Sequence, residues 1–524
     1  MTAKITREDQ LPPFANEPFS DFSKPHVRAA MEAALAQVGS ELGREYPAYI
    51  GGQKVTATQK IRSIDPSCSS RLVGIVQDCP PELGDLAVQA ALGAFESWSL
   101  VPAPERCEIF FRAKELLRQR RFEFNAWIIY EVGKNWAEAD ADVAEMVDFF
   151  DYYCRSMIRL NQPPELVQVS EEKNRLAYIP LGVGVCISPW NFPCAIMGGM
   201  AAAAAVAGNT VVSKPSEDAP VVATKLVELM IEAGVPAGVL NLVTGTGAAL
   251  GAHLVRHPKV RFVSFTGSRE VGCQVVENAA KVSDGQRWLK RVVAEMGGKN
   301  AIIVADDADL DSAAQGVTAA AFGYQGQKCS ACSRVVVFDS VHDRFVEKLL
   351  AATRALTVGP AQDPSTNVGP VISGRAYEKV FHYIQLGKEE GKLLMGGERT
   401  ESDGFFVPPT IFDEVRPGAR IAQEEIFGPV LAVIRARDYD HALEIANGTA
   451  FGLTGAVYSS SPDRLERAAR EFHVGNLYLN RKCTGAMVGR HPFGGFNMSG
   501  TDSKTGGPDY LLQFTQAKTV CAKI

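Results

Sequence analysis

The chain has 524 residues, of which 46% are hydrophobic and 22% are charged, and its net charge is −6. This length accommodates two to four domains with ample buried core, and the ordinary composition excludes a wholly disordered chain. The mildly acidic balance and the lack of a Lys/Arg-rich run exclude a nucleic-acid-binding protein.

The sequence also bears on location. The N-terminal stretch MTAKITREDQLPPF contains no apolar run typical of a signal peptide. The most apolar segment, 197–206, is too short to span a hydrocarbon core about 30 Å thick, so no membrane partner is expected. The 11 cysteines are scattered without the spacing of a disulfide framework, which predicts a reducing, cytoplasmic location.

Apolar periodicity predicts the order of elements along the chain. Residues 1–50 contain several prolines and then an Ala-rich helical stretch, which indicates an arm packed on a larger body. Helical spacing over 81–103 and 105–153 indicates two or three long helices. Short apolar runs then alternate with helical stretches, and the runs are 183–187, 210–213, 239–243, 261–265, 301–304 and 335–338.

This alternation predicts βαβ units, with parallel sheets that are covered by helices on both faces. We therefore predict an α/β fold of two lobes joined near Gly297 and Gly298. The apolar run Tyr510–Phe514 is predicted to form a further strand near the C-terminus.

Cys329 lies in the run GQKCSAC, in a glycine-containing turn after an Ala-rich stretch. A nucleophilic thiol needs a depressed pKa, an accessible position and positive potential, and Lys328 directly precedes this cysteine. The residues alone leave two other interpretations open: a buried structural cysteine, or a redox or metal pair with Cys332. Four-ligand zinc needs a second pair at similar spacing, which the sequence lacks, so no metal is predicted.

Glu295 and Asn191 are candidates for the polar chemistry around such a thiol. Glu295 precedes the two glycines of the lobe junction, where a carboxylate with a raised pKa acts as a general base. The alternative is an exposed Glu at a helix end. Asn191 follows the run 183–187, and its amide can donate to a developing oxyanion, the alternative being a simple turn residue.

Segments that follow predicted strands indicate a bound nucleotide. Lys214 and Glu217 lie beyond the run 210–213, where ligands bind in open α/β sheets. A carboxylate at this place accepts both ribose hydroxyls and repels a 2′-phosphate. Gly245–Gly251 has one residue too many for a dinucleotide glycine loop and matches it only weakly. Ser268 opens a helix whose first N–H groups can hold a diphosphate.

Seven motifs occur in order along the chain: SPWNFP, KPSE, FTGSREVG, EMGGKN, GQKCSACSR, EEIFGPV and PFGGFNMSG. Together they resemble the aldehyde dehydrogenase superfamily, and the similarity runs from about residue 50 to the C-terminus. The segments 131–153 and 480–511 resemble the branch that oxidises L-glutamate γ-semialdehyde, the open form of 1-pyrroline-5-carboxylate. The length leads us to expect a monofunctional form, without the proline dehydrogenase domain that some relatives carry.

The resemblance implies NAD as cofactor and a thioester mechanism. Cys329 would attack the aldehyde carbon, Asn191 and the Cys329 N–H would hold the oxyanion, and Glu295 would activate water after hydride transfer. The residues implied for NAD are Ser188, Trp190, Lys214, Glu217, Gly247, Gly251, Ser268, Val271, Glu425 and Phe427. Those implied for the substrate are Ser330, Gly485 and Ala486 at its α-carboxylate, with Phe192 and Phe493 flanking its aliphatic part.

The resemblance also implies a Rossmann-like NAD-binding lobe, a second α/β catalytic lobe and a small strand-based oligomerisation element. A homo-oligomer, either a dimer or an assembly of dimers, and a small aldehyde substrate are therefore expected. The expected boundaries are 1–50 for an N-terminal arm, 51–296 for the NAD-binding domain with a protruding segment near 160–180, 297–500 for the catalytic domain and 501–524 for an oligomerisation strand.

Three alternatives have distinct signatures. A dehydrogenase of another semialdehyde or aliphatic aldehyde, with NAD or NADP, does not need the free backbone donors that two glycines provide at 484–489. A catalytically silent relative with a binding role has no chemical reason to keep Cys329, Glu295 and Asn191 together. An esterase would use the same thiol without forming NADH.

Overall fold

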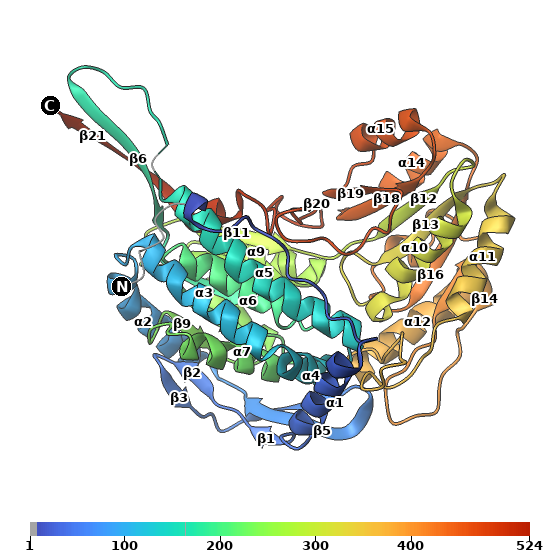
Figure 1. Ribbon diagram of the computed structural model, residues 1–524, viewed down its shortest axis with the longest axis horizontal. Helices are drawn as coiled ribbons and strands as arrows, with labels where there is room; N and C mark the ends of the chain where they lie inside the picture. The colour runs from blue at the N-terminus through green and yellow to red at the C-terminus, as the bar shows by residue number, and fades with distance from the viewer. Residues whose placement is uncertain (1–7, 163) are drawn as a thin grey trace.

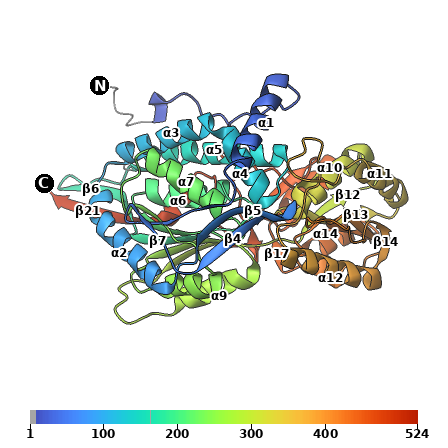
Figure 2. The same ribbon diagram turned by 90° about the horizontal axis from the view of Figure 1, so that it is seen from below.

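The computed structural model describes residues 8–162 and 164–524 and contains two seven-stranded sheets, each flanked by helices (Figure 1, Figure 2). The first sheet has the order β11-β10-β7-β8-β9-β2-β3, and its strands from β11 to β9 are parallel. The bounds are β2 (Ala48–Ile50), β3 (Gln53–Val55), β7 (Val183–Ile187), β8 (Thr210–Lys214), β9 (Leu240–Leu242), β10 (Phe262–Thr266) and β11 (Arg291–Glu295).

The second sheet has the order β14-β15-β16-β13-β12-β18-β19 and is parallel except at β14. The chain passes from the first sheet to the second between β11 and β12, through Gly297 and Gly298, as the sequence predicts. The bounds are β12 (Asn300–Val304), β13 (Cys332–Phe338), β14 (Lys392–Met395), β15 (Thr410–Asp413), β16 (Val430–Ala436), β18 (Thr454–Tyr458) and β19 (Asn476–Leu479).

Helices connect the parallel strands and cover both faces of each sheet. In the first sheet, α6 and α7 lie on one face, and α2 and α9 lie on the other (Figure 2). Four helices, α2 to α5, occupy the stretch where two or three were expected. The bounds are α1 (Pro25–Gly39), α2 (Pro81–Trp98), α3 (Ala103–Gln119), α4 (Arg121–Val132), α5 (Trp136–Leu160), α6 (Ala195–Val206), α7 (Pro220–Glu232), α8 (Ala252–Arg256), α9 (Arg269–Ala280), α10 (Leu310–Phe322), α11 (His342–Arg354), α12 (Gly374–Glu390), α13 (Arg420–Gln423), α14 (Tyr439–Asn447) and α15 (Pro462–Glu471).

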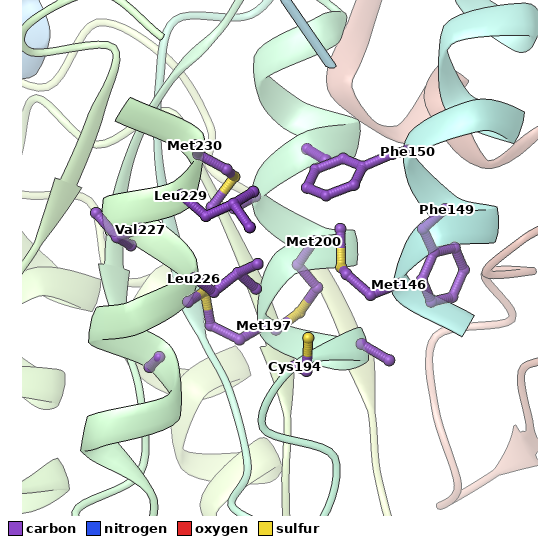
Figure 3. Close-up of a cluster of buried hydrophobic side chains, with 14 of the residues drawn as sticks. Met146, Phe149, Phe150, Cys194, Met197, Met200, Leu226, Val227, Leu229 and Met230 are labelled. Carbon is purple, nitrogen blue, oxygen red and sulfur yellow. The ribbon is translucent and has the colours of Figure 1, made fainter. Parts of the chain in front are cut away.

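The Ala-rich helix α6 lies in the core between α5 and α7 (Figure 3). Its small side chains let the neighbouring helices approach closely. A Cβ at Gly198 would lie 2.3 Å from the Met146 Sδ of α5 and 2.7 Å from a methyl of Leu226 in α7. The most apolar segment of the chain is therefore a buried core helix. No helix within the described residues combines the length and apolar character needed to cross a membrane.

A two-stranded antiparallel ribbon projects from the body of the molecule (Figure 1). It pairs β6 (Glu172–Pro180) with β21 (Thr515–Lys523) over nine residue pairs. The strand predicted at Tyr510–Phe514 is wrong, because this run forms a 3₁₀ helix and the strand begins only at Thr515. The apolar side chains turn into the core instead, where the Phe514 ring lies 5.4 Å from the ring of Phe262.

Residues 12–23, which we name the N-terminal strap, run along α5 before α1 begins (Figure 1). The strands outside the two seven-stranded sheets and the ribbon form smaller sheets of two or three strands. Of the arm expected over residues 1–50, the described residues 8–50 pack on the body of the molecule, and β2 within them joins the first sheet. The smaller strands are β1 (Arg44–Glu45), β4 (Lys60–Asp65), β5 (Cys68–Gln77), β17 (Phe451–Gly452) and β20 (Phe496–Asn497).

Candidate active site

The predicted functional residues of the first half lie at the carboxyl ends of the parallel strands of the first sheet. Ser188 follows β7, Lys214 ends β8, Ser268 lies just beyond β10 and Glu295 ends β11. Because β11, β10, β7 and β8 are parallel neighbours, these four positions share one edge of the sheet. This edge is where an open α/β sheet binds its ligand.

Lys214, Glu217, Gly247 and Gly251 form one group at this edge. The Gly247 N–H donates to Glu217 Oε2 at 3.3 Å, and a Cβ at Gly251 would lie 3.5 Å from the Lys214 Cδ. Lys214 Nζ donates to the Pro215 carbonyl at 2.9 Å, and burial lowers the pKa of this lysine to about 8. Gly247–Gly251 is a single π-helical turn leading into α8, which explains its poor match to a standard glycine loop.

Two serines complete the polar lining of the edge. The Ser268 hydroxyl accepts from the Val271 N–H at 3.3 Å and caps α9, while the Val271 side chain is 44% exposed. The buried Ser188 hydroxyl has no hydrogen-bond partner among the described residues. It is therefore available to a ligand.

Trp190, Glu425 and Phe427 lie where the two sheets meet. The Phe427 ring is edge-on to Trp190 at 5.5 Å, and Phe427 has a positive φ of 60°. Glu425 Oε1 accepts from the Gly298 N–H at 3.0 Å, and burial raises the pKa of Glu425. A Cβ at Gly297 would lie 2.2 Å from Glu425 Oε2, so only glycine fits at this junction. The carboxylate of Glu424, next to Glu425 in the sequence, accepts hydrogen bonds from Arg420 and Tyr383 instead.

Cys329 lies in a loop, residues 326–331, that connects α10 to β13. Tyr324 and Gln325 before it both have left-handed φ angles, and Gln325 donates to the carbonyls of Gly133 and Pro370. The side-chain amide of Asn300 donates to the carbonyls of Cys329 (2.7 Å) and Ala331 (2.8 Å). The surrounding structure therefore holds a backbone conformation that isolated residues rarely adopt.

The electrostatic environment of Cys329 differs from the prediction. We expected Lys328 to help depress the pKa of the thiol, but burial and the carboxylates of Glu425 and Glu295 raise it to about 12. Lys328 does not oppose this effect, because its ammonium forms an ion pair with Glu138 at 2.6 Å. In this structure Cys329 is a neutral thiol, which needs a base or a cationic ligand to become a nucleophile.

Asn191 is buried and contacts the Cys329 loop. Its Nδ2 donates to the Gln327 carbonyl at 3.0 Å. This bond occupies one N–H of the amide and fixes its orientation, so the second N–H remains available as a donor. The structure thus gives Asn191 an ordered place beside the loop rather than in a simple exposed turn.

Glu295 is the last residue of β11 and is only 8% exposed, so an exposed helix-end Glu is the wrong interpretation. Its Oε1 accepts a short hydrogen bond from the Ser503 hydroxyl. Its Oε2 is buried without a hydrogen-bond partner among the described residues. Burial raises the pKa of Glu295 to about 8, which suits a general base.

One cavity of about 540 Å³ brings together the residues predicted for catalysis and substrate binding, except Asn191, whereas the predicted NAD-binding residues do not line it. Residues 328–330 of the Cys329 loop line the cavity, as do residues 485–488 of the segment 484–489, which we name the glycine loop. Gly485 in this loop has a positive φ of 79°, which favours glycine. Seven of the residues predicted for catalysis or substrate binding line the cavity, namely Phe192, Glu295, Cys329, Ser330, Gly485, Ala486 and Phe493.

The cavity also contains residues that the sequence analysis missed. Glu145 of α5 lines it, and burial with nearby Asp142 raises the pKa of Glu145 to about 8. The sequence feature that could have pointed to Glu145 is a row of carboxylates at helical spacing along 138–148. Phe19 and Ser20 of the N-terminal strap line the cavity as well. The part of the chain that the structure describes contains no group of three acidic, His or Cys side chains suited to a metal ion.

Similarity to known proteins agrees with this arrangement. The model of the aldehyde dehydrogenase family matches residues 54–520. The 1-pyrroline-5-carboxylate dehydrogenase of Geobacillus thermodenitrificans (strain NG80-2) is 54% identical over 508 residues, which cover 97% of this chain and 99% of the relative. That of Bacillus subtilis (strain 168) is 54% identical over 506 residues, with 97% and 98% covered.

A solved structure, 1-pyrroline-5-carboxylate dehydrogenase from Thermus with bound NAD, matches with a TM-score of 0.97 and 49% identity. The match covers 98% of this chain and 100% of that chain. With a family match over most of its length and relatives that share half of its residues, the chain belongs to the aldehyde dehydrogenase family.

Proposed function

We propose that this protein oxidises L-glutamate γ-semialdehyde to L-glutamate with NAD, the second step of proline degradation. The observation that carries the proposal is the composition of the cavity. Cys329 shares it with the backbone donors of the glycine loop and with the carboxylate of Glu145, so an aldehyde with an α-amino acid end has a partner for each group. The function in the names of the relatives supports the same substrate.

The described residues fit NAD. The unpartnered Ser188 hydroxyl, the ammonium of Lys214 and the carboxylate of Glu217 lie at or just beyond the carboxyl edge of the first sheet. A Cβ at Gly247 would meet nothing within 4 Å, so the backbone is open there. Bound NAD supplies the hydride acceptor. The Thermus relative was solved with NAD, which supports this cofactor.

The chain's own groups perform the remaining steps. The Cys329 thiol gives its proton to water as its sulfur attacks the aldehyde carbon, and the Asn191 amide and the Cys329 N–H donate to the resulting oxyanion. Loss of hydride from that carbon leaves a thioester on Cys329. Glu295 takes a proton from water, the hydroxide attacks the thioester, and L-glutamate leaves as the sulfur is released.

A substrate panel tests the proposal. We expect kcat/KM for glutamate γ-semialdehyde to exceed that for butanal by about 10²-fold or more, because butanal leaves the polar donors unpaired. A semialdehyde that carries the carboxylate but no amine should fall between them. NADH formation in stopped assays measures all three. Equal kcat/KM for the first two aldehydes would reject the substrate, and no NADH from any aldehyde would reject the enzyme.

Glu217 gives a prediction about the choice of cofactor. Its carboxylate repels a 2′-phosphate, so we expect NAD to be preferred and Glu217→Gln to raise kcat/KM for NADP relative to NAD by about tenfold. Glu232→Gln is the matched control, since it removes an exposed carboxylate at the far end of α7. A similar change in both variants would assign the effect to net charge rather than to this site.

We also propose a homo-oligomer and the domain boundaries stated above. The ribbon of β6 and β21 projects from the body, and Val167, just before it, is 90% exposed (Figure 1). Exposed strand edges and apolar side chains of this kind favour association with another copy. A cytoplasmic location is supported by the free thiols of all eleven cysteines.

A further inference from the structure

The N-terminal strap connects two walls of the cavity through one side chain. Asn16 Nδ2 donates to Asp148 Oδ2 of α5 at 2.8 Å and to the Val488 carbonyl of the glycine loop at 2.9 Å. These partners are 132 and 472 residues away in the sequence. One amide group therefore holds the glycine loop against α5.

Aromatic packing reinforces this connection at the end of the glycine loop. The Phe14 ring of the strap lies edge-on to Tyr152 of α5 at 5.2 Å. Gly489 has a φ of 74°, and a Cβ there would lie 2.9 Å from the Tyr152 ring and 3.1 Å from the Phe14 ring. The loop therefore ends in a tight contact with the strap, which only glycine permits.

The strap also supplies donors to acidic side chains that face the cavity. The Ser20 N–H and hydroxyl donate to Asp140 at 2.7 and 2.8 Å, and the Glu17 N–H donates to Asp148 at 2.7 Å. Glu138 is paired with Lys328. Of the four α5 carboxylates that line the cavity, Glu145 alone has no hydrogen-bond or ion-pair partner among the described residues.

The strap lies outside the part of the chain that the family model matches, which begins at residue 54. It nevertheless forms part of the cavity wall through Phe19 and Ser20. Features common to the family therefore do not account for its place at the site.

We propose that the N-terminal strap is a specificity element: it positions the glycine loop and holds Asp148, and together with Arg121 and Asn125 it holds Asp140, so that Glu145 is the acidic side chain left for the substrate ammonium. Asn16 is its central positioning residue. Among the described residues, no hydrogen bond, ion pair or ring contact joins the strap to the predicted NAD-binding residues, so we place its effect at the amino acid end of the substrate. This inference rests on the proposed function.

Asn16→Ala tests the proposal in the full-length enzyme. We expect KM for glutamate γ-semialdehyde to rise about tenfold, since two hydrogen bonds that order the loop are lost, one of them to a carboxylate. The kcat value, KM for NAD and kcat/KM for butanal should stay within about twofold, because the groups at the reacting carbon are untouched. Thermal unfolding measured alongside reports whether the variant is folded.

Matched variants make the outcome decisive. Asn16→Asp keeps the size of the side chain but replaces the N–H donors by a charge beside Asp148, and it should raise the same KM at least as much. Ser23→Ala, which removes an exposed hydroxyl bonded only to Asp21, should change nothing. If the Asn16 variants fail to fold, Phe19→Ala tests the role of the strap instead. The Phe19 side chain is 61% exposed, so its removal should leave the fold intact and still raise the semialdehyde KM about threefold.

The two proposals fail in different ways. If the wild-type enzyme does not prefer the semialdehyde to butanal, the proposed function is wrong. If the preference holds but the Asn16 variants lose kcat/KM for both aldehydes equally, or for neither, the role of the strap is overturned.

Discussion

Replacing Cys329 by Ala is expected to lower semialdehyde oxidation by more than about 10³-fold while changing NAD affinity less than twofold. The variant lacks the sulfur that attacks the aldehyde carbon, and the cavity within the described residues contains no other thiol. The predicted NAD contacts lie on other residues, so the cofactor should still bind. Initial rates of NADH formation and calorimetric titration with NAD measure the two effects.

Cys332→Ala is the matched control for this experiment. The Cys332 thiol is buried and donates to the Arg334 carbonyl at 3.2 Å, and Cys332 begins β13 rather than facing the cavity. Its removal should cost about 1 kcal/mol of stability or more but leave most of the turnover. If Cys329→Ala kept residual activity and Cys332→Ala lost it, the nucleophile would be Cys332 and not Cys329.

Replacing Glu295 by Gln is expected to slow thioester hydrolysis by about 10²–10⁴-fold while hydride transfer continues. A rapid burst of NADH, close to one per active site, should then precede slow steady-state turnover in stopped-flow absorbance. Loss of both the burst and the steady state would show that Glu295 acts earlier, for example by taking the proton from the Cys329 thiol.

The pH dependence of hydrolysis provides the second arm of this test. Because the pKa of Glu295 is about 8, the group is mostly protonated at neutral pH and gains its basic form as the pH rises. The hydrolysis rate should therefore increase up to about pH 8 and level off above it, and this increase should vanish in Glu295→Gln. Ser503→Ala keeps the carboxylate but removes the hydrogen bond that lowers its pKa, so its profile should shift to higher pH.

The sequence located the carboxyl edge of the first sheet well, for a physical reason. Each parallel strand is a short apolar run bounded by turn residues, so β7 was predicted with its observed bounds and β8 to within one residue. Residues that follow such strands must meet at one edge, and Ser188, Lys214 and Ser268 do so. The substrate residues came from the resemblance of whole motifs, not from periodicity.

The features that the sequence did not predict share a different cause, because they depend on contacts between residues far apart in the chain. Burial and the carboxylate of Glu425 raise the pKa of Cys329, and Lys328 pairs with Glu138, 190 residues away. Likewise, Tyr510–Phe514 has the composition of a strand, but packing against Phe262 and Tyr153 turns it into a 3₁₀ helix. No local pattern contains this information.

The bond between Asn16 and the Val488 carbonyl also constrains the order in which the newborn chain completes its cavity. At about 5–20 residues per second, a ribosome needs about 25–90 s to proceed from the first partner to the second. Through that interval Asn16 can bond to Asp148 but not to Val488, which has not yet been synthesised. A chain that ends before the glycine loop would therefore leave Asn16 with one of its two hydrogen bonds, although the strap could already be bound to α5 through Glu17 and Ser20.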